Sequence, residues 1–259
     1  MLKKSLGQHL LKDRNLLEKM VRMAGIGPDD FVLEIGPGEG DLTRCIAKKA
    51  LLVYAVELDE RFREALSALA REFPNVEIVF SDILGVSFSD FRNGRGITVM
   101  GNIPYYLTGE ILFKLLDEKA AIRAAYLTMQ KEVAERIVSP PRSRSYGAVS
   151  VIFRLYADVR LLLLIKPGLF IPPPKVESAF ISVVFKDGKE LDRGLIEFVK
   201  LSFRYKRKYL RNCLEGRFRR EEIDALYVRM GFPPSIRAEE IEPEGFVEMH
   251  RFLGGGLRA

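Results

Sequence analysis

The chain has 259 residues, of which 47% are hydrophobic and 29% are charged. This composition is typical of a globular protein with a buried core and excludes a disordered chain. No apolar run reaches the ~18–20 residues that a membrane-spanning helix needs, and the N-terminus lacks the apolar core of a secretory signal. Two cysteines are too few for a disulfide framework. We therefore expect a soluble, cytoplasmic protein without membrane contact.

The net charge of +6 is unevenly distributed along the chain. Residues 200–220 contain nine Lys or Arg and one acid, so this segment carries +8 and the remainder −2. Such a patch suits either a nucleic-acid backbone or an ordinary solvated helix face. A helix here would place Arg204, Lys208 and Arg211 on one face, with Arg207 beside them. The candidate nucleic-acid contacts are Arg204, Lys206, Arg207, Lys208 and Arg211.

In chain order, apolar spacing first predicts a helix over residues 10–24. Short β-rich runs then predict strands at 31–35, 51–57, 76–80, 97–102 and 124–129. Helical patterns follow the glycine turn at 34–40 and cover 59–71 and 108–118. Strands that alternate with helices predict a mostly parallel sheet with right-handed crossovers.

In the second half of the chain, the strand pattern stops at about residue 186 and a helical pattern follows. A helix is predicted at 131–136, a basic loop at 139–147 and a further helix at 147–159. Residues 160–166 and 178–185 predict an antiparallel hairpin at the sheet edge. Several short helices are predicted over 190–253. We therefore expect two domains, residues 1–186 and 187–259.

The glycine-rich segment EIGPGEG (34–40) joins a predicted strand to a predicted helix. Glycines at such a turn let the backbone approach a ligand closely. The spacing differs from the G-x-G-x-x-G of pyrophosphate binders. Its acids, Glu34 and Glu39, disfavour a pyrophosphate and tolerate a cationic ligand such as a sulfonium. A dinucleotide site, a methyl-donor site and a simple tight turn remain open for Gly36 and Gly38.

Acidic residues follow the next two strands. Glu57, about 20 residues past the glycines, can accept hydrogen bonds from both hydroxyls of a ribose. Asp82 can accept from an adenine amino group, or it can cap the next turn. Because ligands of open α/β sheets bind at the carboxyl ends of the strands, we predict one site here. The neighbouring Leu58 and Ile83 belong to it.

The segment NIPY (102–105) follows the fourth strand. An exocyclic adenine amine is a poor nucleophile because its lone pair is delocalised into the ring. The Asn102 side-chain oxygen and the Ile103 carbonyl can accept from its N–H groups and make the lone pair available. Pro104 fixes the turn, and Tyr105 offers a face on which a flipped base stacks. The alternative interpretation is a proline turn with a buried tyrosine.

Taken together, these segments resemble the KsgA family of small-subunit (16S) rRNA adenine N6,N6-dimethyltransferases, which use S-adenosylmethionine. The resemblance covers nearly the whole chain and rests on SLGQHLLKD (5–13), EIGPGEGDLT (34–43), VELD (56–59), GNIPYYLT (101–108), MQKEVAERI (129–137), YGAVSV (146–151), FIPPPKVESA (170–179), FRYKRKYLRN (203–212) and RAEEI (237–241). The erythromycin-resistance 23S rRNA methyltransferases resemble the first half only.

The resemblance implies roles at matching positions. It implies that Gln8, His9 and Leu11 close over the donor and that the Gly36 loop holds its methionine end. His9 stands where the family often has Asn, so its contact is through either its backbone or its side chain. Phe170 is implied as a second aromatic on the flipped base.

The resemblance further implies a class I, Rossmann-like α/β fold with a seven-stranded mostly parallel sheet and a small helical C-terminal RNA-binding domain. The implied reaction is dimethylation of two adjacent adenines in the 3′-terminal hairpin loop of small-subunit rRNA. We expect S-adenosylmethionine as donor, no metal, an immature 30S-type subunit as partner, and a monomer. Alternatives are a 23S rRNA adenine methyltransferase, a non-catalytic RNA-binding assembly factor, or a small-molecule methyltransferase.

Overall fold

The computed structural model describes residues 9–91, 94, 96–205 and 207–254. Its chain forms two compact units. The first comprises residues 1–134 and 158–185, and the second comprises residues 135–157 and 186–259. Residues 135–157 thus group with the C-terminal helices, although the sequence pattern assigns them to the first domain. Helix α6, Ala148–Tyr156, packs against the C-terminal helices α7, Arg193–Ser202, and α10, Pro243–Gly254. Chain order alone does not reveal these packing partners.

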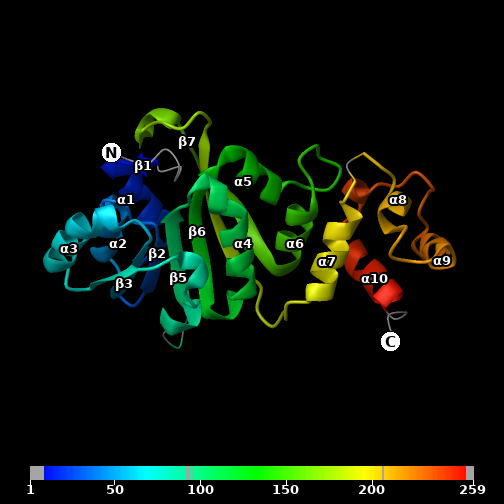
Figure 1. The fold of residues 1–259 in the computed structure, drawn as a ribbon, viewed down its shortest axis with the longest axis horizontal. Coiled ribbons are helices and arrows are strands. Elements are labelled where there is room, and N and C mark those ends of the chain that lie inside the picture. Colours follow the sequence, from blue (N-terminus) through cyan, green and yellow to red (C-terminus); the bar gives the residue numbers. More distant parts are fainter. Residues whose placement is uncertain (1–8, 92–93, 95, 206, 255–259) are drawn as a thin grey trace. The chain divides into compact units, whose positions relative to one another are not determined.

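The first unit is built on a seven-stranded sheet with the order β4-β3-β2-β5-β6-β9-β7 (Figure 1). The strands β2 to β6 pair in parallel, and β9 runs antiparallel to β6. Their bounds are β2 Phe31–Ile35, β3 Leu52–Glu57, β4 Val76–Phe80, β5 Ile97–Asn102, β6 Ile122–Gln130, β7 Ala157–Ile165 and β9 Ser178–Phe185. All seven predicted strands are present, and β7 and β9 are neighbours at one edge.

Helices follow the strands as the alternating pattern predicts. In the first unit they are α1 Arg14–Met23, α2 Asp41–Ala47, α3 Arg63–Glu72 and α4 Thr108–Asp117, and α5 Lys131–Val138 begins there. Side chains such as Met20 of α1 and Ile46 of α2 pack with Val32 and Val53 of the sheet in one core cluster. Val32 and Leu33 are both fully buried, because both faces of β2 are covered.

A short second sheet lies outside this pattern. Strand β1, Leu10–Leu11, pairs antiparallel with β8, Phe170–Ile171. The helix predicted from residue 10 therefore begins only at Arg14, where the Asp13 side chain accepts a hydrogen bond from the Leu16 amide. Leu11 and Phe170 lie opposite each other, and both are buried in the core. A two-residue strand has too few residues to show the period-2 pattern that predicts strands.

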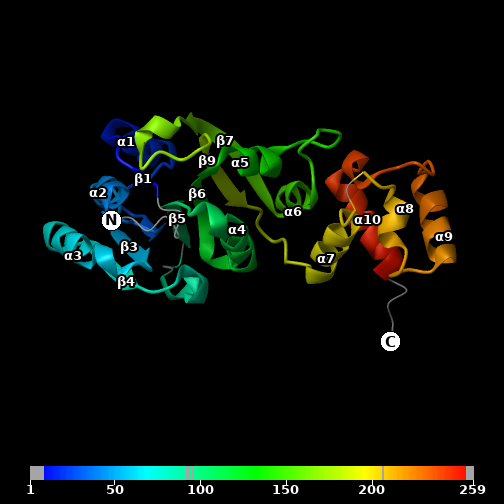
Figure 2. The same cartoon turned by 45° about the horizontal axis from the view of Figure 1, so that its top comes forward.

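The second unit consists of helices (Figure 2). They are α6 Ala148–Tyr156, α7 Arg193–Ser202, α8 Leu210–Leu214, α9 Arg220–Met230 and α10 Pro243–Gly254, together with the end of α5. No helix among the described residues is long and apolar enough to cross a membrane.

The prediction of one basic helix around residues 200–211 is wrong. Helix α7 ends at Ser202, and α8 begins at Leu210. Between them, the Phe203 ring stacks on Phe246 at a centroid distance of 5.6 Å, and Arg207 adopts a left-handed backbone with φ 65°. A continuous helix would also bring like charges together at four-residue spacing, which is unfavourable. The basic residues therefore do not share one helical face.

The close approach of β2 and β5 requires glycine at position 101. A Cβ atom there would lie 2.7 Å from the Ile35 carbonyl oxygen. We expect Gly101→Ala to lower the free energy of unfolding by about 1–3 kcal/mol, because backbone must move. Urea denaturation measures the change. Gly109→Ala is the matched control, since an added Cβ meets nothing within 4 Å. Equal stability of the two variants would contradict the steric explanation.

Candidate active site

Two adjoining clefts open at the carboxyl ends of β2, β3, β4 and β5. They enclose about 500 and 470 Å³ and share Gly36, Glu57 and Pro104. The first cleft is further lined by Ile35, Val56, Leu58, Asp59, Ser81, Asp82, Ile83, Tyr106, Leu107 and Ile111. The second is further lined by His9, Leu10, Gly38, Phe62, Asn102, Ile103 and Tyr105. The structure thus brings together the residues that the sequence places after separate strands.

The buried carboxylate of Glu57 joins the end of β3 to the glycine loop. Its Oε2 accepts a hydrogen bond from the Gly38 amide at 3.0 Å, and its Oε1 accepts from the Asp59 amide at 2.8 Å. Burial raises the pKa of Glu57, and these two amide hydrogen bonds oppose that rise. A carboxylate has about four acceptor positions. Glu57 also lines both clefts.

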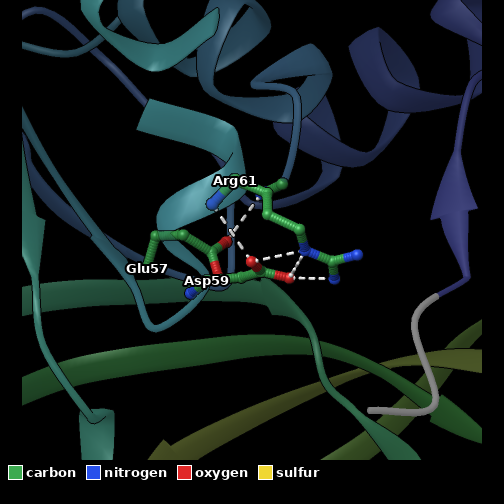
Figure 3. A network of polar contacts seen from close by, with 4 residues as sticks. Glu57, Asp59 and Arg61 are labelled. Atoms are coloured by element: carbon green, nitrogen blue, oxygen red, sulfur yellow. Dashed lines mark hydrogen bonds and ion pairs between the residues drawn. The ribbon is translucent and has the colours of Figure 1, made fainter. Parts of the chain in front are cut away.

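Figure 3 shows how the chain continues past Glu57. The Arg61 guanidinium reaches back to Asp59, with Nε 2.8 Å from Oδ1, and the two side chains form an ion pair. Since Asp59 lines the first cleft, this pair partly neutralises an acid there. The sequence motif VELD contains this acid, but only the structure shows its partner.

The first cleft is largely apolar between its acids, with Ile83 and Leu58 on its wall. Asp82 lies at its edge and caps the next turn, because its Oδ1 accepts from the Leu84 amide at 2.9 Å. The turn-capping alternative for Asp82 is therefore realised. Its second carboxylate oxygen is available for a ligand, so the two interpretations are compatible.

In the second cleft, Asn102 ends β5 and Tyr105 begins a short 3₁₀ turn, η5 Tyr105–Leu107. Asn102 Nδ2 donates to the His9 carbonyl oxygen at 2.5 Å. The Ile103 amide donates to Thr128 at 2.9 Å, which ties the turn to β6. Within the described part of the chain, neither Asn102 Oδ1 nor the Ile103 carbonyl accepts a hydrogen bond. Both oxygens are therefore free to accept from a ligand.

The Tyr105 ring lies beside the imidazole of His9, with 5.5 Å between ring centroids. Its hydroxyl hydrogen-bonds to Ser178 Oγ at 2.7 Å. The imidazole Nδ1 is 2.7 Å from the Pro172 carbonyl oxygen, so the His9 side chain contacts the proline-rich loop and its backbone contacts Asn102. These contacts hold the tyrosine by both its edge and its hydroxyl.

Glu34 lies in β2 beneath the glycine loop and does not line either cleft. It is 1% exposed, and its Oε2 has no hydrogen-bond partner in the described structure. Burial raises the pKa of Glu34 to about 8, and the neighbouring charges of Glu57 and Asp41 add to the rise. Glu34 is therefore mostly uncharged at neutral pH, and it does not repel anions as the sequence interpretation assumes.

Several predicted site residues lie elsewhere. Leu11 points into the core, and the neighbouring Leu10 lines the second cleft. Phe170 is 1% exposed within the same core, so its ring is not presented for stacking on a base. This placement follows from the pairing of β8 with β1, which directs both apolar side chains inward. Gln8 and Lys206 fall outside the described residues.

Sequence reasoning also missed a cation at the glycine loop. Lys12 Nζ lies 2.5 Å from Glu39 Oε2 and 2.6 Å from Asp41 Oδ2. The loop is therefore less acidic than its local sequence indicates. A search limited to residues 34–44 cannot find this lysine, because it precedes the loop by more than twenty positions.

The second unit contains an open groove lined by arginines. Its charged walls include Arg142 and Arg144 of the loop after α5, Arg207 and Arg237, and the acids Glu239 and Glu240. Tyr209 also lines it, 46% exposed, with the Arg237 guanidinium 5.8 Å from its ring centroid. By contrast, Arg211 forms an ion pair with Asp224 at 2.7 Å. The predicted basic patch is therefore redistributed, and among those of its members that the structure describes only Arg207 lines this groove.

The seven-stranded, mostly parallel sheet with its ligand cleft at the strand ends is the fold of a class I methyltransferase. A dimethyladenosine transferase structure from Plasmodium falciparum superimposes with a TM-score of 0.84 at 23% identity, covering 95% of this chain and 98% of that one. The structure of the 23S rRNA methyltransferase ErmE gives a TM-score of 0.72 at 26% identity, covering 95% and 99%.

Sequence comparison defines the family. The model of the family described as ribosomal RNA adenine dimethylase matches residues 1–253. Ribosomal RNA small subunit methyltransferase A of Shouchella clausii is 35% identical, over 99% of this chain and 91% of the relative. The protein of the same name from Francisella tularensis subsp. novicida is 38% identical over 97% of each chain. The chain belongs to the ribosomal RNA adenine dimethylase family, and the predicted fold, family and enzyme class are confirmed.

The buried Glu34 generates a pH prediction. Its pKa is about 8 in the folded chain against 4.5 ordinarily, so the folded state retains a proton that the unfolded state loses. The free energy of unfolding should therefore fall as pH rises from about 4.5 to 8 and then level off. Glu34→Gln should remove this loss of stability. Each unit of pKa difference corresponds to roughly 1.4 kcal/mol, so the loss amounts to several kcal/mol. Urea denaturation at pH 5 and 8 measures it.

The exposed Glu64→Gln is the control for this series. It should parallel the unaltered protein at both pH values. A Glu34→Gln variant that also parallels the unaltered protein would show that Glu34 ionises normally.

Proposed function

We propose that this enzyme transfers methyl groups from S-adenosylmethionine to N6 of two adjacent adenines in the 3′-terminal hairpin loop of small-subunit rRNA, so that each becomes dimethylated. The observation that carries the proposal is the convergence of Glu57 and Asn102 on adjoining clefts that share one wall. The relatives named ribosomal RNA small subunit methyltransferase A support the choice of RNA.

The donor fits the residues present. Gly36 and Gly38 have φ of 66° and 59°, which leaves backbone rather than side chains facing the cleft. The Glu57 carboxylate lines the cleft as an acceptor for the ribose hydroxyls, and the apolar wall with Leu58 and Ile83 suits an adenine ring beside Asp82. When bound, S-adenosylmethionine supplies an electrophilic methyl group on a sulfonium. Carboxylates nearby favour that positive charge.

The residues at the end of β5 prepare the accepting amine. In the first transfer, Asn102 Oδ1 and the Ile103 carbonyl accept from the two N–H groups of adenine N6, and in the second transfer one of them accepts from the N–H group that remains. These contacts favour a pyramidal nitrogen with an available lone pair. Pro104 holds the turn, and Tyr105 supports the base by stacking, a contact worth ~1–3 kcal/mol. The nitrogen gains the methyl group and releases one proton to solvent in each transfer.

The arginine-lined groove of the second unit is the proposed binding site for rRNA. Guanidinium groups bind phosphates with paired hydrogen bonds, and an exposed tyrosine among them offers a stacking surface. Arg142, Arg144, Arg207 and Arg237 meet both needs with Tyr209. Arg204, Lys206 and Lys208 remain proposed contacts with rRNA, whereas Arg211 forms an ion pair with Asp224.

The alternatives have weaker support. The erythromycin-resistance type is represented by a 23S rRNA methyltransferase structure at 26% identity, below the 35–38% of the small-subunit relatives. A non-catalytic assembly factor has no need for free acceptors at both Asn102 and Ile103. A small-molecule methyltransferase has no need for an arginine groove. We further propose a cytoplasmic monomer that acts on immature 30S-type subunits, in keeping with its two free, buried cysteines.

The decisive experiment is methyl transfer from labelled S-adenosylmethionine to unmodified small subunits, followed by nucleoside analysis. The unaltered protein should form N6,N6-dimethyladenosine at two adjacent positions. Asn102→Ala should lower kcat about 100-fold or more, because one acceptor for the amine is lost, the scale seen for other transition-state hydrogen bonds. Near-normal turnover by this variant would remove Asn102 from the proposed role.

The groove generates a separate prediction about salt. Replacing Arg142, Arg144, Arg207 and Arg237 by Gln should reduce the slope of log K against log salt for rRNA binding by roughly 3 units, since each neutralised phosphate contributes about 0.7–0.9. Filter binding across salt concentrations measures this slope. The matched control replaces four other exposed arginines of the unit, Arg217, Arg219, Arg220 and Arg229. An equal reduction in both variants would mean that net charge, not the groove, binds RNA.

A further inference from the structure

The Lys12 side chain connects three parts of the first unit. Its ammonium group bonds to Glu39 in the glycine loop and to Asp41 in the first turn of α2. The Lys12 side chain is 29% exposed, while those of Glu39 and Asp41 are 49% and 37% exposed. One cation shared by two acids forms a network, and networks hold their geometry better than isolated surface pairs. Lys12 thus ties the N-terminal segment to the donor loop.

Lys12 keeps its positive charge across the ordinary pH range. Burial disfavours its charge, but the hydrogen bonds to Asp41 and Glu39 outweigh burial and raise the pKa of Lys12 above 10.5. The contact is therefore an ion pair wherever the two carboxylates are ionised. Its strength should depend on ionic strength rather than on pH near neutrality.

The segment that Lys12 ties down covers the glycine loop. Leu10 lies so close to the loop that a Cβ at Gly38 would be 2.6 Å from its Cδ2. On its other side, the segment is held by the β1–β8 pairing and by the Lys12 amide, which donates to the Leu169 carbonyl at 3.3 Å. Strand pairing holds it to β8, and the ammonium group holds it to the loop.

The same segment orients the Asn102 amide. Asn102 Nδ2 donates to the His9 carbonyl, so Oδ1 is left as the free end of the amide. If the amide turned over, its N–H groups would face an incoming amine, and two donors cannot hydrogen-bond to each other. The position of the His9 carbonyl therefore decides whether Asn102 presents an acceptor.

We propose that Lys12 is a positioning residue, which clamps residues 9–12 onto the glycine loop and thereby retains the methyl donor and keeps Asn102 Oδ1 aimed at the target amine. The proposal rests on the proposed function. Both the residence time of the donor and the orientation of the Asn102 amide depend on the ion pairs of Lys12 with Glu39 and Asp41.

The test compares Lys12→Met, Lys12→Arg and the unaltered protein. Methionine retains most of the side-chain length but removes the charge. We expect Lys12→Met to speed S-adenosylmethionine dissociation roughly three- to tenfold, the range that the loss of such a network gives. Its kcat should fall while KM for the rRNA stays unchanged. Lys12→Arg should restore both values, because its guanidinium can reach the same two acids.

The salt dependence of donor dissociation distinguishes the clamp from a purely structural role of Lys12. Raising the salt concentration should speed donor dissociation from the unaltered protein more than from Lys12→Met, whose clamp is already absent. The control variant is Arg14→Met, which removes a neighbouring exposed pair with Glu18. It should leave donor dissociation and kcat unchanged.

The outcomes separate this proposal from the function on which it rests. If the unaltered protein fails to bind S-adenosylmethionine, the proposed function fails. If it binds the donor and methylates rRNA but Lys12→Met stays within twofold in dissociation rate and kcat, only the clamp is overturned. Loss in Lys12→Met without recovery in Lys12→Arg, at equal thermal stability, also overturns the clamp.

Discussion

The site depends on one buried carboxylate. Glu57 stands at the end of β3, accepts hydrogen bonds from the Gly38 and Asp59 amides, and so fixes the glycine loop against the neighbouring strand. Burial makes its charge costly and raises its pKa, and the two amide hydrogen bonds offset part of that cost. Because both clefts share this carboxylate and Gly36, any displacement of Glu57 changes both clefts together.

A second constraint comes from the N-terminal segment. Its backbone pairs with β8, its Leu11 side chain enters the core, and its His9 carbonyl receives the Asn102 amide. Residues far apart in sequence thus fix the polarity of a single side chain in the cleft. The proposed mechanism needs an acceptor at that point, and an amide is an acceptor at only one of its two ends.

Charge has different roles in the two units. In the first unit, acids and bases pair across the site, as Arg61 does with Asp59 and Lys12 does with Glu39 and Asp41. In the second unit, arginines gather around a groove with an exposed tyrosine. The first arrangement favours a cationic small molecule, and the second favours a polyanion. An enzyme that joins a sulfonium donor to an RNA substrate needs both.

Local pattern was sufficient for the strands, because β2, β4, β5 and β9 end where their apolar runs end. It also predicted that Gly36, Glu57, Asp82 and Asn102 lie together, because parallel strands align their carboxyl ends. It failed for Phe170, for Leu11, which lies in the core while Leu10 lines the second cleft, and for the helix over the segment 203–209. The side a β8 residue faces depends on its pairing with β1, and Phe203 ends a helix by stacking on Phe246. Lys12 and Arg237 reach their sites only through folding. Periodicity and motif spacing act over a few residues, whereas these contacts join segments separated by tens of positions, and only the packed chain brings such segments together.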